Sequence, residues 1–209
     1  MDTRTAYNNW ASQYDTNVNA TRDLEAKALR DITAAAPFDK VLEIGCGTGK
    51  NTVWYAEKAK QVTAIDLSDE MLARAKQKIT AAHVEFKQAD ITQSWATFAD
   101  GPFNLVSFSL VLEHIDNLDH IFEQVAASLG TGGYVYIGEL HPFKQYTGTK
   151  ARFETTEGLQ IVECFNHHIT DFTGDAKKHG LEIVKIEEYF DNNDRNNLPR
   201  ILALLLKKA

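Results

Sequence analysis

The residues with the clearest chemical potential form a glycine-rich loop, Gly45-Cys46-Gly47-Thr48-Gly49, which follows an apolar run at residues 41–44. Glycine has no Cβ atom, so a bulky ligand can approach the main chain of such a loop closely. A loop between a strand and a helix also presents backbone N–H groups to that ligand. The third glycine of a dinucleotide fingerprint would fall on Lys50, and no Lys-Ser/Thr pair follows the loop. This pattern disfavours both a NAD site and a nucleoside triphosphate site.

Three carboxylates lie near the ends of the predicted strands around this loop. Glu43 directly precedes the loop, Asp66 ends the next apolar run, and Asp90 follows the third run. A carboxylate at the position of Asp66 can accept hydrogen bonds from both hydroxyls of a ribose, and Asp90 suits the exocyclic amine of an adenine. A pocket lined by several acids is a poor host for pyrophosphate. The acids therefore favour a cationic ligand with an adenosine half.

Two histidines follow predicted strands on the same side of the sheet. His114 comes after the fourth strand and His141 after the fifth. An unperturbed imidazole has a pKa of roughly 6.5, which suits a general base, so both are candidate catalytic residues. The alternative for His114 is a histidine that packs or hydrogen-bonds at the start of a helix, and for His141 a structural role in a loop. His141 and His168 are also candidate contacts of an acceptor molecule.

A polar cluster near residue 165 could in principle bind a metal ion. It includes pairs at helical spacing among Glu163, Cys164, His167, His168 and Asp171. However, no second cluster completes a coordination set, and strand-to-helix junctions often collect polar caps. We therefore expect no metal site in this chain.

The elements that must position these residues alternate between short apolar runs and amphipathic segments. Such alternation predicts a doubly wound α/β sheet with helices on both faces. The predicted strands lie at residues 41–44, 61–65, 83–87, 103–108, 134–137, 181–189 and 201–206. Helices are expected at residues 23–36, 51–60 and 171–179. Two more are expected: one that Ser68 caps, and one that begins near Leu118 and ends at Gly130. Residues 141–168 interrupt the alternation, and a turn around Glu157-Gly158 could fold part of this insertion into a hairpin near the ligand crevice.

Length and charge narrow the classes of protein further. A chain of 209 residues with 44% hydrophobic residues fits a single globular domain. The net charge of −7 repels phosphate backbones and anionic lipid, so neither nucleic acid nor a membrane is an expected partner. The opening residues lack a signal-peptide pattern, which predicts a cytoplasmic protein. The two cysteines, Cys46 and Cys164, are far apart in sequence, and we expect no disulfide framework and a filler role for Cys46.

Four ordered segments of the sequence resemble the class I S-adenosylmethionine-dependent methyltransferases that act on small molecules. They are Val41-Leu42-Glu43-Ile44 with the glycine loop, Val62-Thr63-Ala64-Ile65-Asp66 with the following Leu67-Ser68-Asp69-Glu70-Met71-Leu72, Ala89-Asp90-Ile91, and Phe103 to His114. The resemblance implies S-adenosylmethionine as cofactor and a small-molecule methyl acceptor. It also implies that the last strand, at residues 201–206, is antiparallel to its neighbours.

The resemblance assigns roles to individual residues as well. The cofactor's methionine part is expected over the loop, from Gly45 and Cys46 through Gly47 and Thr48 to Gly49, beside Glu43. Asp66 would hold the ribose, while Leu67 and Met71 would flank the adenine. Asp90 and Ile91 would read the edge of that base, and Ser109 and Leu110 would lie near the sulfonium.

The aromatic opening of the chain resembles the N-terminal helix that closes over the cofactor in small-molecule members of this family. Tyr7, Trp10 and Tyr14 share one helical face. Residues 1–36 are then a helical lid, in which Tyr14 contacts the cofactor and Tyr7 and Trp10 contact the acceptor. The alternative is an aromatic stripe that packs on the core. For the whole chain the alternatives are a non-catalytic S-adenosylmethionine-binding sensor or partner subunit and an NAD-dependent oxidoreductase.

Overall fold

The computed structural model describes residues 2–16, 18–155 and 158–209. Seven strands form one sheet in the order β3-β2-β1-β4-β5-β9-β8, and two further strands, β6 and β7, form a hairpin. The strands are β1 (Lys40–Ile44), β2 (Gln61–Asp66), β3 (Val84–Gln88), β4 (Phe103–Ser109), β5 (Leu129–Leu140), β6 (Arg152–Thr155), β7 (Gly158–Ile161), β8 (Leu181–Tyr189) and β9 (Ile201–Lys208). All seven strands predicted from the apolar runs are present.

The sheet is parallel from β3 to β5, and β9 runs antiparallel to both β5 and β8. The antiparallel last strand that the family resemblance implied is confirmed. β9 is apolar along most of its length because it lies between two other strands and is covered on both faces.

The fifth strand begins earlier than the apolar pattern indicated. β5 starts at Leu129, directly after a helix that ends at Ser128, so Gly130 lies within the strand and does not end the helix. Phe103 pairs with Leu129, whereas Leu105 pairs with Tyr134, so the extra residues on β5 form an irregularity in the ladder. Gly132 has a φ of 74° there, a backbone conformation that glycine adopts readily. This irregularity hides the strand's first residues from a periodicity argument.

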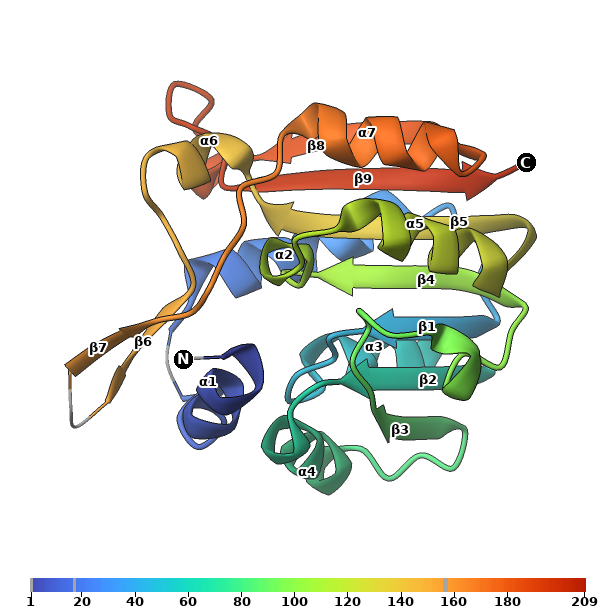
Figure 1. Ribbon diagram of the computed structural model, residues 1–209, viewed down its shortest axis with the longest axis horizontal. Helices are drawn as coiled ribbons and strands as arrows, with labels where there is room; N and C mark the ends of the chain where they lie inside the picture. Colours follow the sequence, from blue (N-terminus) through green and yellow to red (C-terminus); the bar gives the residue numbers. More distant parts are fainter. Residues whose placement is uncertain (1, 17, 156–157) are drawn as a thin grey trace.

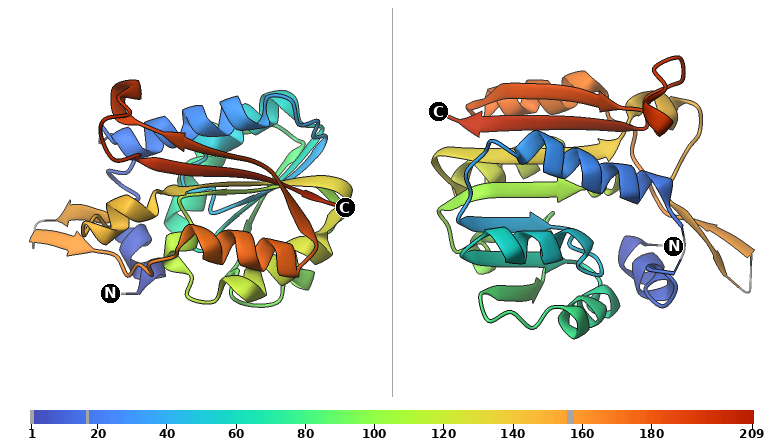
Figure 2. Two further views of the ribbon diagram at one scale, coloured as in Figure 1. Left: turned by 90° about the horizontal axis from the view of Figure 1, so that it is seen from above. Right: turned by 180° about the vertical axis from the view of Figure 1, so that it is seen from behind.

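Helices cover both faces of the sheet, as the alternating pattern predicted (Figure 1 and Figure 2). The α-helices are α1 (Thr3–Trp10), α2 (Ala20–Thr33), α3 (Lys50–Lys58), α4 (Asp69–Lys78), α5 (Leu118–Ser128), α6 (Pro142–Tyr146) and α7 (Ile169–Lys178). Short 3-10 helices lie at η1 (Trp95–Thr97), η2 (Leu112–His114) and η3 (Asp191–Asn193). One core cluster joins α2, α3 and α4 to the sheet, and a second joins α5 and α7 to its other face.

Helix α1 packs away from the main core, between α4 and the β6–β7 hairpin (Figure 1). The ring of Trp10 on α1 stacks on Phe153 of β6 at a centroid distance of 5.0 Å, and Met71 of α4 belongs to the same apolar cluster. The hairpin forms within residues 141–168, as expected, although Glu157 of the predicted turn lies outside the described residues. Both segments lie beside the carboxyl ends of the parallel strands (Figure 1).

Among the residues that the structure describes, none of the helices has the length and apolar character needed to cross a bilayer.

Candidate functional site

A cavity of about 580 Å³ opens at the carboxyl ends of β1, β2 and β4. This volume is in the usual range for a small-molecule site, and the position is where doubly wound sheets bind ligands. Its lining comes from α1 and the residues around it, the strand ends, α4, the segment after β3, η2 with its neighbours, and the segment after β7. The residues are Asp2, Thr3, Arg4, Tyr7, Tyr14, Ile44, Gly45, Gly47, Ile65, Asp66, Leu67, Met71, Ala89, Asp90, Ile91, Thr92, Ser109, Leu110, Val111, His114, Ile115 and Glu163.

The glycine loop has a left-handed backbone at each of its three glycines, with φ values of 70°, 55° and 85° at Gly45, Gly47 and Gly49. A Cβ atom at Gly45 would lie 2.2 Å from Cγ2 of Val111, so this glycine allows the loop to pack on the segment after β4. A Cβ atom at Gly47 would meet no atom within 4 Å. Gly47 therefore leaves open space at the cavity, which a ligand can use.

Asp66 ends β2 with its carboxylate held by two backbone groups. Oδ2 accepts a 2.7 Å hydrogen bond from the N–H of Gly47, and Oδ1 accepts a 2.8 Å bond from the N–H of Ser68. Burial raises the pKa of Asp66 to about 6, against the opposing effect of these backbone N–H groups. A carboxylate has about four lone-pair positions, so two remain for the hydroxyl groups of a ligand.

The part of the cavity next to Asp66 combines an apolar wall with one carboxylate. Leu67, Met71 and Ile91 form the wall. Met71 lies on α4 and is fully buried against α1. Asp90 lines the same region, and its Oδ1 accepts hydrogen bonds from the N–H and the hydroxyl of Thr92 at 2.9 and 2.7 Å. A flat apolar slot with an acceptor at its edge suits a heteroaromatic ring with an amino group.

Ser109 ends β4 and Leu110 follows it, and both residues line this cavity and a smaller one of about 50 Å³. Leu110 has a φ of 58°, unusual for a residue with a side chain, and its N–H donates to the carbonyl of Gly138 at 2.8 Å. Such backbone strain concentrates at ligand sites. Of the other residues expected at the cofactor, the smaller cavity includes Tyr14, Glu43, Cys46 and Thr48.

Glu43 lines only the smaller cavity, whereas Gly49 lies outside both. The Glu43 carboxylate is buried and accepts a 2.5 Å hydrogen bond from the hydroxyl of Thr52 on α3. Burial raises its pKa to about 8, and the neighbouring charges of Glu25 and Asp66 act in the same direction. Gly49 caps α3 and lines neither cavity.

His114 is the one sequence-predicted catalytic residue that lines the main cavity. Its Nδ1 lies 2.8 Å from the carbonyl oxygen of Glu163, and its Nε2 lies 2.8 Å from the hydroxyl of Tyr7. Because a carbonyl can only accept, Nδ1 carries the proton, and the lone pair of Nε2 accepts from the Tyr7 hydroxyl. The geometry therefore fixes the tautomer and directs the basic nitrogen toward α1.

His141, His168 and Trp10 do not line the main cavity. His141 is fully buried at the start of α6, where its N–H donates to the carbonyl of Arg200 and its Nε2 lies 3.2 Å from Glu188. His168 precedes α7, and its Nδ1 lies 2.6 Å from the hydroxyl of Tyr146. Trp10 packs on the hairpin. We therefore leave these three residues out of the proposed site.

The sequence did not single out Arg4, Glu163 or Val111 as residues of the site, yet all three line the cavity. Arg4 precedes Tyr7 by three positions, so a helical face that carries Tyr7 also carries Arg4. This spacing was available in the sequence. Glu163 and Val111 gave no such signal, because their positions depend on how the segment after β7 packs on η2.

Comparisons with known proteins agree with this geometry. The methyltransferase domain family matches residues 42–137. An uncharacterized methyltransferase of Staphylococcus carnosus is 31% identical, over 90% of this chain and 95% of that relative. The chain belongs to the methyltransferase family. An uncharacterized methyltransferase of Emericella nidulans is 26% identical to this methyltransferase, over 100% of the chain and 86% of the relative.

Solved structures show the same fold as this methyltransferase. The N-methyltransferase NodS from Bradyrhizobium japonicum, in complex with S-adenosyl-l-homocysteine, has a TM-score of 0.74 at 17% identity, and the match covers 100% of this chain and 99% of NodS. A putative S-adenosylmethionine-dependent methyltransferase from Listeria monocytogenes also has a TM-score of 0.74, at 24% identity, over 90% of this chain and 99% of that one. The resemblance to class I methyltransferases drawn from the sequence is confirmed.

Proposed function

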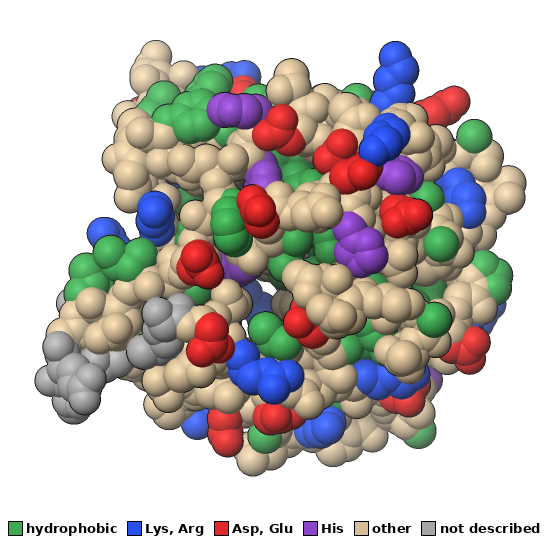
Figure 3. Space-filling model, in the orientation of Figure 1, with side chains coloured by type: hydrophobic (Ala, Val, Ile, Leu, Met, Phe, Trp, Pro, Cys, Tyr) green, Lys and Arg blue, Asp and Glu red, His purple; other side chains and the backbone are tan. Residues whose placement is uncertain are grey.

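We propose that this methyltransferase transfers the methyl group of S-adenosylmethionine to a small-molecule acceptor that binds between the strand ends and α1. The observation that carries the proposal is the Asp66 carboxylate, which faces a cavity beside the open space at Gly47. The face of the molecule in Figure 3 supports a small acceptor, because acidic and basic side chains are mixed over the part of it that the structure describes. A protein that binds nucleic acid usually has its basic residues clustered in one surface patch.

The residues present fit this cofactor by their chemistry. The apolar wall of Leu67, Met71 and Ile91 suits an adenine, and Asp90 at its edge suits the amino group of that base. Asp66 suits the two hydroxyls of a ribose. The open space at Gly47 admits a ligand that passes close to the main chain. The NAD-dependent alternative receives no support from this set, because Lys50 stands where a dinucleotide fingerprint requires a third glycine.

When bound, S-adenosylmethionine supplies a methyl group on a positively charged sulfur, which a nucleophile can attack in line. The protein's contribution is to hold the two molecules in position and to exclude water. Tyr7 and Tyr14 close the cavity on the side of α1. Asp66 has a pKa of about 6 and is therefore ionised at neutral pH, and its charge favours a cationic ligand in the neighbouring region electrostatically.

His114 is the proposed proton acceptor for an acceptor molecule that must lose a proton. Its Nε2 is unprotonated in this tautomer, and the Nε2 lone pair accepts a hydrogen bond from the Tyr7 hydroxyl. A hydroxyl or amine of the acceptor that replaces the Tyr7 hydroxyl would meet a base at hydrogen-bond distance. We therefore assign Tyr7 and Arg4, which line the same region, to the acceptor side of the site.

Calorimetric titration tests the cofactor half of the proposal. S-adenosylhomocysteine should bind with 1:1 stoichiometry, and NAD should give no heat of binding. Asp66→Ala should weaken binding about 10-fold or more, because a hydrogen bond to a charged group contributes about 1.5–3 kcal/mol. Asp119→Asn is the matched control, since Asp119 pairs with Lys178 and His179 and lines neither cavity. Binding of NAD, or an unchanged affinity in Asp66→Ala, would contradict the assignment.

Methyl transfer itself is tested with labelled S-adenosylmethionine and pools of metabolites. Labelled product from at least one pool is expected, and His114→Asn should reduce its formation without a comparable loss of S-adenosylhomocysteine affinity. If the cofactor binds tightly but no pool yields product, the result would contradict the proposed methyl transfer and favour a non-catalytic S-adenosylmethionine sensor.

A further inference from the structure

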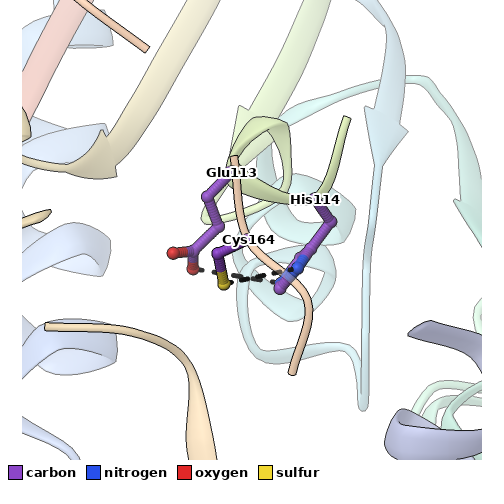
Figure 4. Close-up of side chains that lie close together, drawn as sticks. All are labelled: Glu113, His114 and Cys164. Carbon is purple, nitrogen blue, oxygen red and sulfur yellow. Dashed lines mark hydrogen bonds and ion pairs between the residues drawn. The ribbon is translucent and has the colours of Figure 1, made fainter. Parts of the chain in front are cut away.

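We propose that Glu113, His114 and Cys164 form a binding site for a thiophilic divalent cation of the Zn²⁺ type, at the wall of the methyltransferase cavity. The site does not depend on the identity of the cofactor. It joins two adjacent residues of η2 to a cysteine 50 positions later in the chain, after β7. Figure 4 shows the three side chains pointing toward one another.

The three donor atoms lie close enough for one ion. They are all within 4.8 Å of one another. At the usual Zn–ligand distances, ligand atoms around a tetrahedral ion lie about 3.3–3.6 Å apart, so the side chains must draw together when the ion binds. Nε2 of His114 lies 3.9 Å from Oε1 of Glu113, so these two atoms must approach each other by about 0.5 Å to share a tetrahedral ion. Sγ of Cys164 lies 3.9 Å from Nδ1, the nitrogen of the same ring that donates to Glu163, so Cys164 must also shift toward Nε2 to share the ion.

Glu113 supplies an independent sign that the cluster is incomplete. Its side chain is only 7% exposed, and its Oε2 is buried with no hydrogen-bond partner among the described residues. A buried carboxylate oxygen without a partner costs free energy. A cation between the three side chains would provide the interaction that this oxygen lacks.

His114 is oriented as metal-binding histidines usually are. Such histidines commonly donate their second ring N–H to a carbonyl or carboxylate, which fixes the ring and leaves the other nitrogen free to bind the ion. Here Nδ1 donates to the carbonyl of Glu163 at 2.8 Å, and Nε2 carries the lone pair. The segment that supplies Cys164 thus also supplies the carbonyl that orients the histidine.

The three donors suit a positive ion by their chemistry, since a coordinated thiol loses its proton outright and a carboxylate is negatively charged. The combination of one sulfur, one nitrogen and one oxygen donor is typical of Zn²⁺.

Tyr7 must move for the ion to bind. Its hydroxyl lies 2.8 Å from Nε2 and occupies the direction of the lone pair that the ion requires. Tyr7 and His114 both line the cavity. Three protein ligands leave one position of a tetrahedral ion open, which can take a thiol or hydroxyl ligand. The cation and the Tyr7 hydroxyl therefore compete for one lone pair.

Titration of the purified full chain with Co²⁺ alone, after treatment with a chelator, tests the site directly. We expect one equivalent of Co²⁺ to produce a thiolate-to-cobalt charge-transfer band, and Zn²⁺ to abolish it by displacement. Cys164→Ser should remove the band. Cys46→Ala is the matched control and should retain it, because these are the chain's two cysteines. No band in the parent chain, or a band that survives Cys164→Ser, would overturn the proposal.

Two further variants separate metal binding from a purely structural role. Glu113→Gln should weaken Co²⁺ binding at least 10-fold, while S-adenosylhomocysteine affinity, measured without metal, should stay unchanged. Tyr7→Phe should tighten Co²⁺ binding, because it removes the competing hydroxyl and keeps the ring. Equal Co²⁺ affinity in Glu113→Gln and in the parent chain would refute the ligand assignment. Failure of cofactor binding would instead concern the proposed methyltransferase site and would leave this result intact.

Discussion

Gly45 offers the sharpest test of how the glycine loop is built. In Gly45→Ala the new Cβ would lie 2.2 Å from Cγ2 of Val111, at a backbone φ of 70°. The left-handed conformation costs about 1–2 kcal/mol for a residue with a side chain, and overpacking of this kind costs about 1–3 kcal/mol. We expect the free energy of unfolding to fall by about 2–5 kcal/mol. Gly47→Ala, at a φ of 55° with no atom within 4 Å of its Cβ, should lose only about 1–2 kcal/mol.

Removing the obstructing side chain should restore part of this loss. Val111→Ala deletes both Cγ atoms that approach Gly45, at a cost of roughly 1.6 kcal/mol for two carbon groups if they were fully buried. The double variant with Gly45→Ala should then be more stable than the sum of the single effects by about 1–3 kcal/mol. The φ penalty at Gly45 would remain, because it does not depend on Val111.

Urea unfolding followed by circular dichroism measures these free energies, and titration with S-adenosylhomocysteine measures the site. Gly47→Ala should weaken ligand binding more than its small loss of stability suggests, since its Cβ enters the open space at the cavity. Strictly additive effects of Gly45→Ala and Val111→Ala would refute the steric argument. Unchanged ligand affinity in Gly47→Ala would refute the assignment of that space to the cofactor.

Three other predictions concern stability. Glu43→Gln should be more stable than the parent above pH 8, by at most about 5 kcal/mol at 1.4 kcal/mol per pKa unit. In the folded parent the pKa of Glu43 is raised to about 8. Its protonated carboxyl therefore contributes fully to folding stability below pH 4.5, the ordinary pKa, and this contribution is lost as the pH rises through 8. A stability difference between the two chains that does not change with pH would contradict this. Trp10→Ala should expose the hairpin to proteolysis through loss of the Phe153 stack, whereas Trp10→Phe should largely protect it, and equal cleavage of both variants would disprove the stacking role. Lys78→Ala should cost less than about 1 kcal/mol, because both Lys78 and its partner Asp15 are about two-fifths exposed; a larger loss in denaturant titration would count against this.

The sheet and the cavity residues proposed to hold the cofactor were predictable because each follows from local patterns. Apolar runs mark buried strands, and a ligand site in a doubly wound sheet lies at their carboxyl ends. Gly47, Asp66 and Asp90 were therefore placed from the sequence near one another, and all three line the cavity. The order of the strands was not available from periodicity, which carries no information on neighbours. The antiparallel position of β9 came from the family resemblance alone.

The acceptor side was less predictable because it depends on contacts between distant segments. His141 follows β5, and the sequence placed it at the crevice with His114. In the structure β9 runs beside β5 to its end, where Leu140 pairs with Ile201, and Arg200 and Glu188 hold His141. The insertion of one antiparallel strand thus removes His141 from the cavity. The approach of Cys164 to His114, across 50 residues, likewise has no local signal in the sequence.

One lone pair connects the two proposals made for His114. Nε2 can take a proton from an acceptor or bind a cation, but a single lone pair serves one of these at a time. In the structure it does neither, because the hydroxyl of Tyr7 occupies it. Tyr7 lies on α1, which packs on Met71 and on the hairpin and makes few contacts with the main sheet. A movement of α1 that withdraws Tyr7 would therefore expose the histidine for either role. The position of α1 decides whether the site has an available base or metal ligand at all.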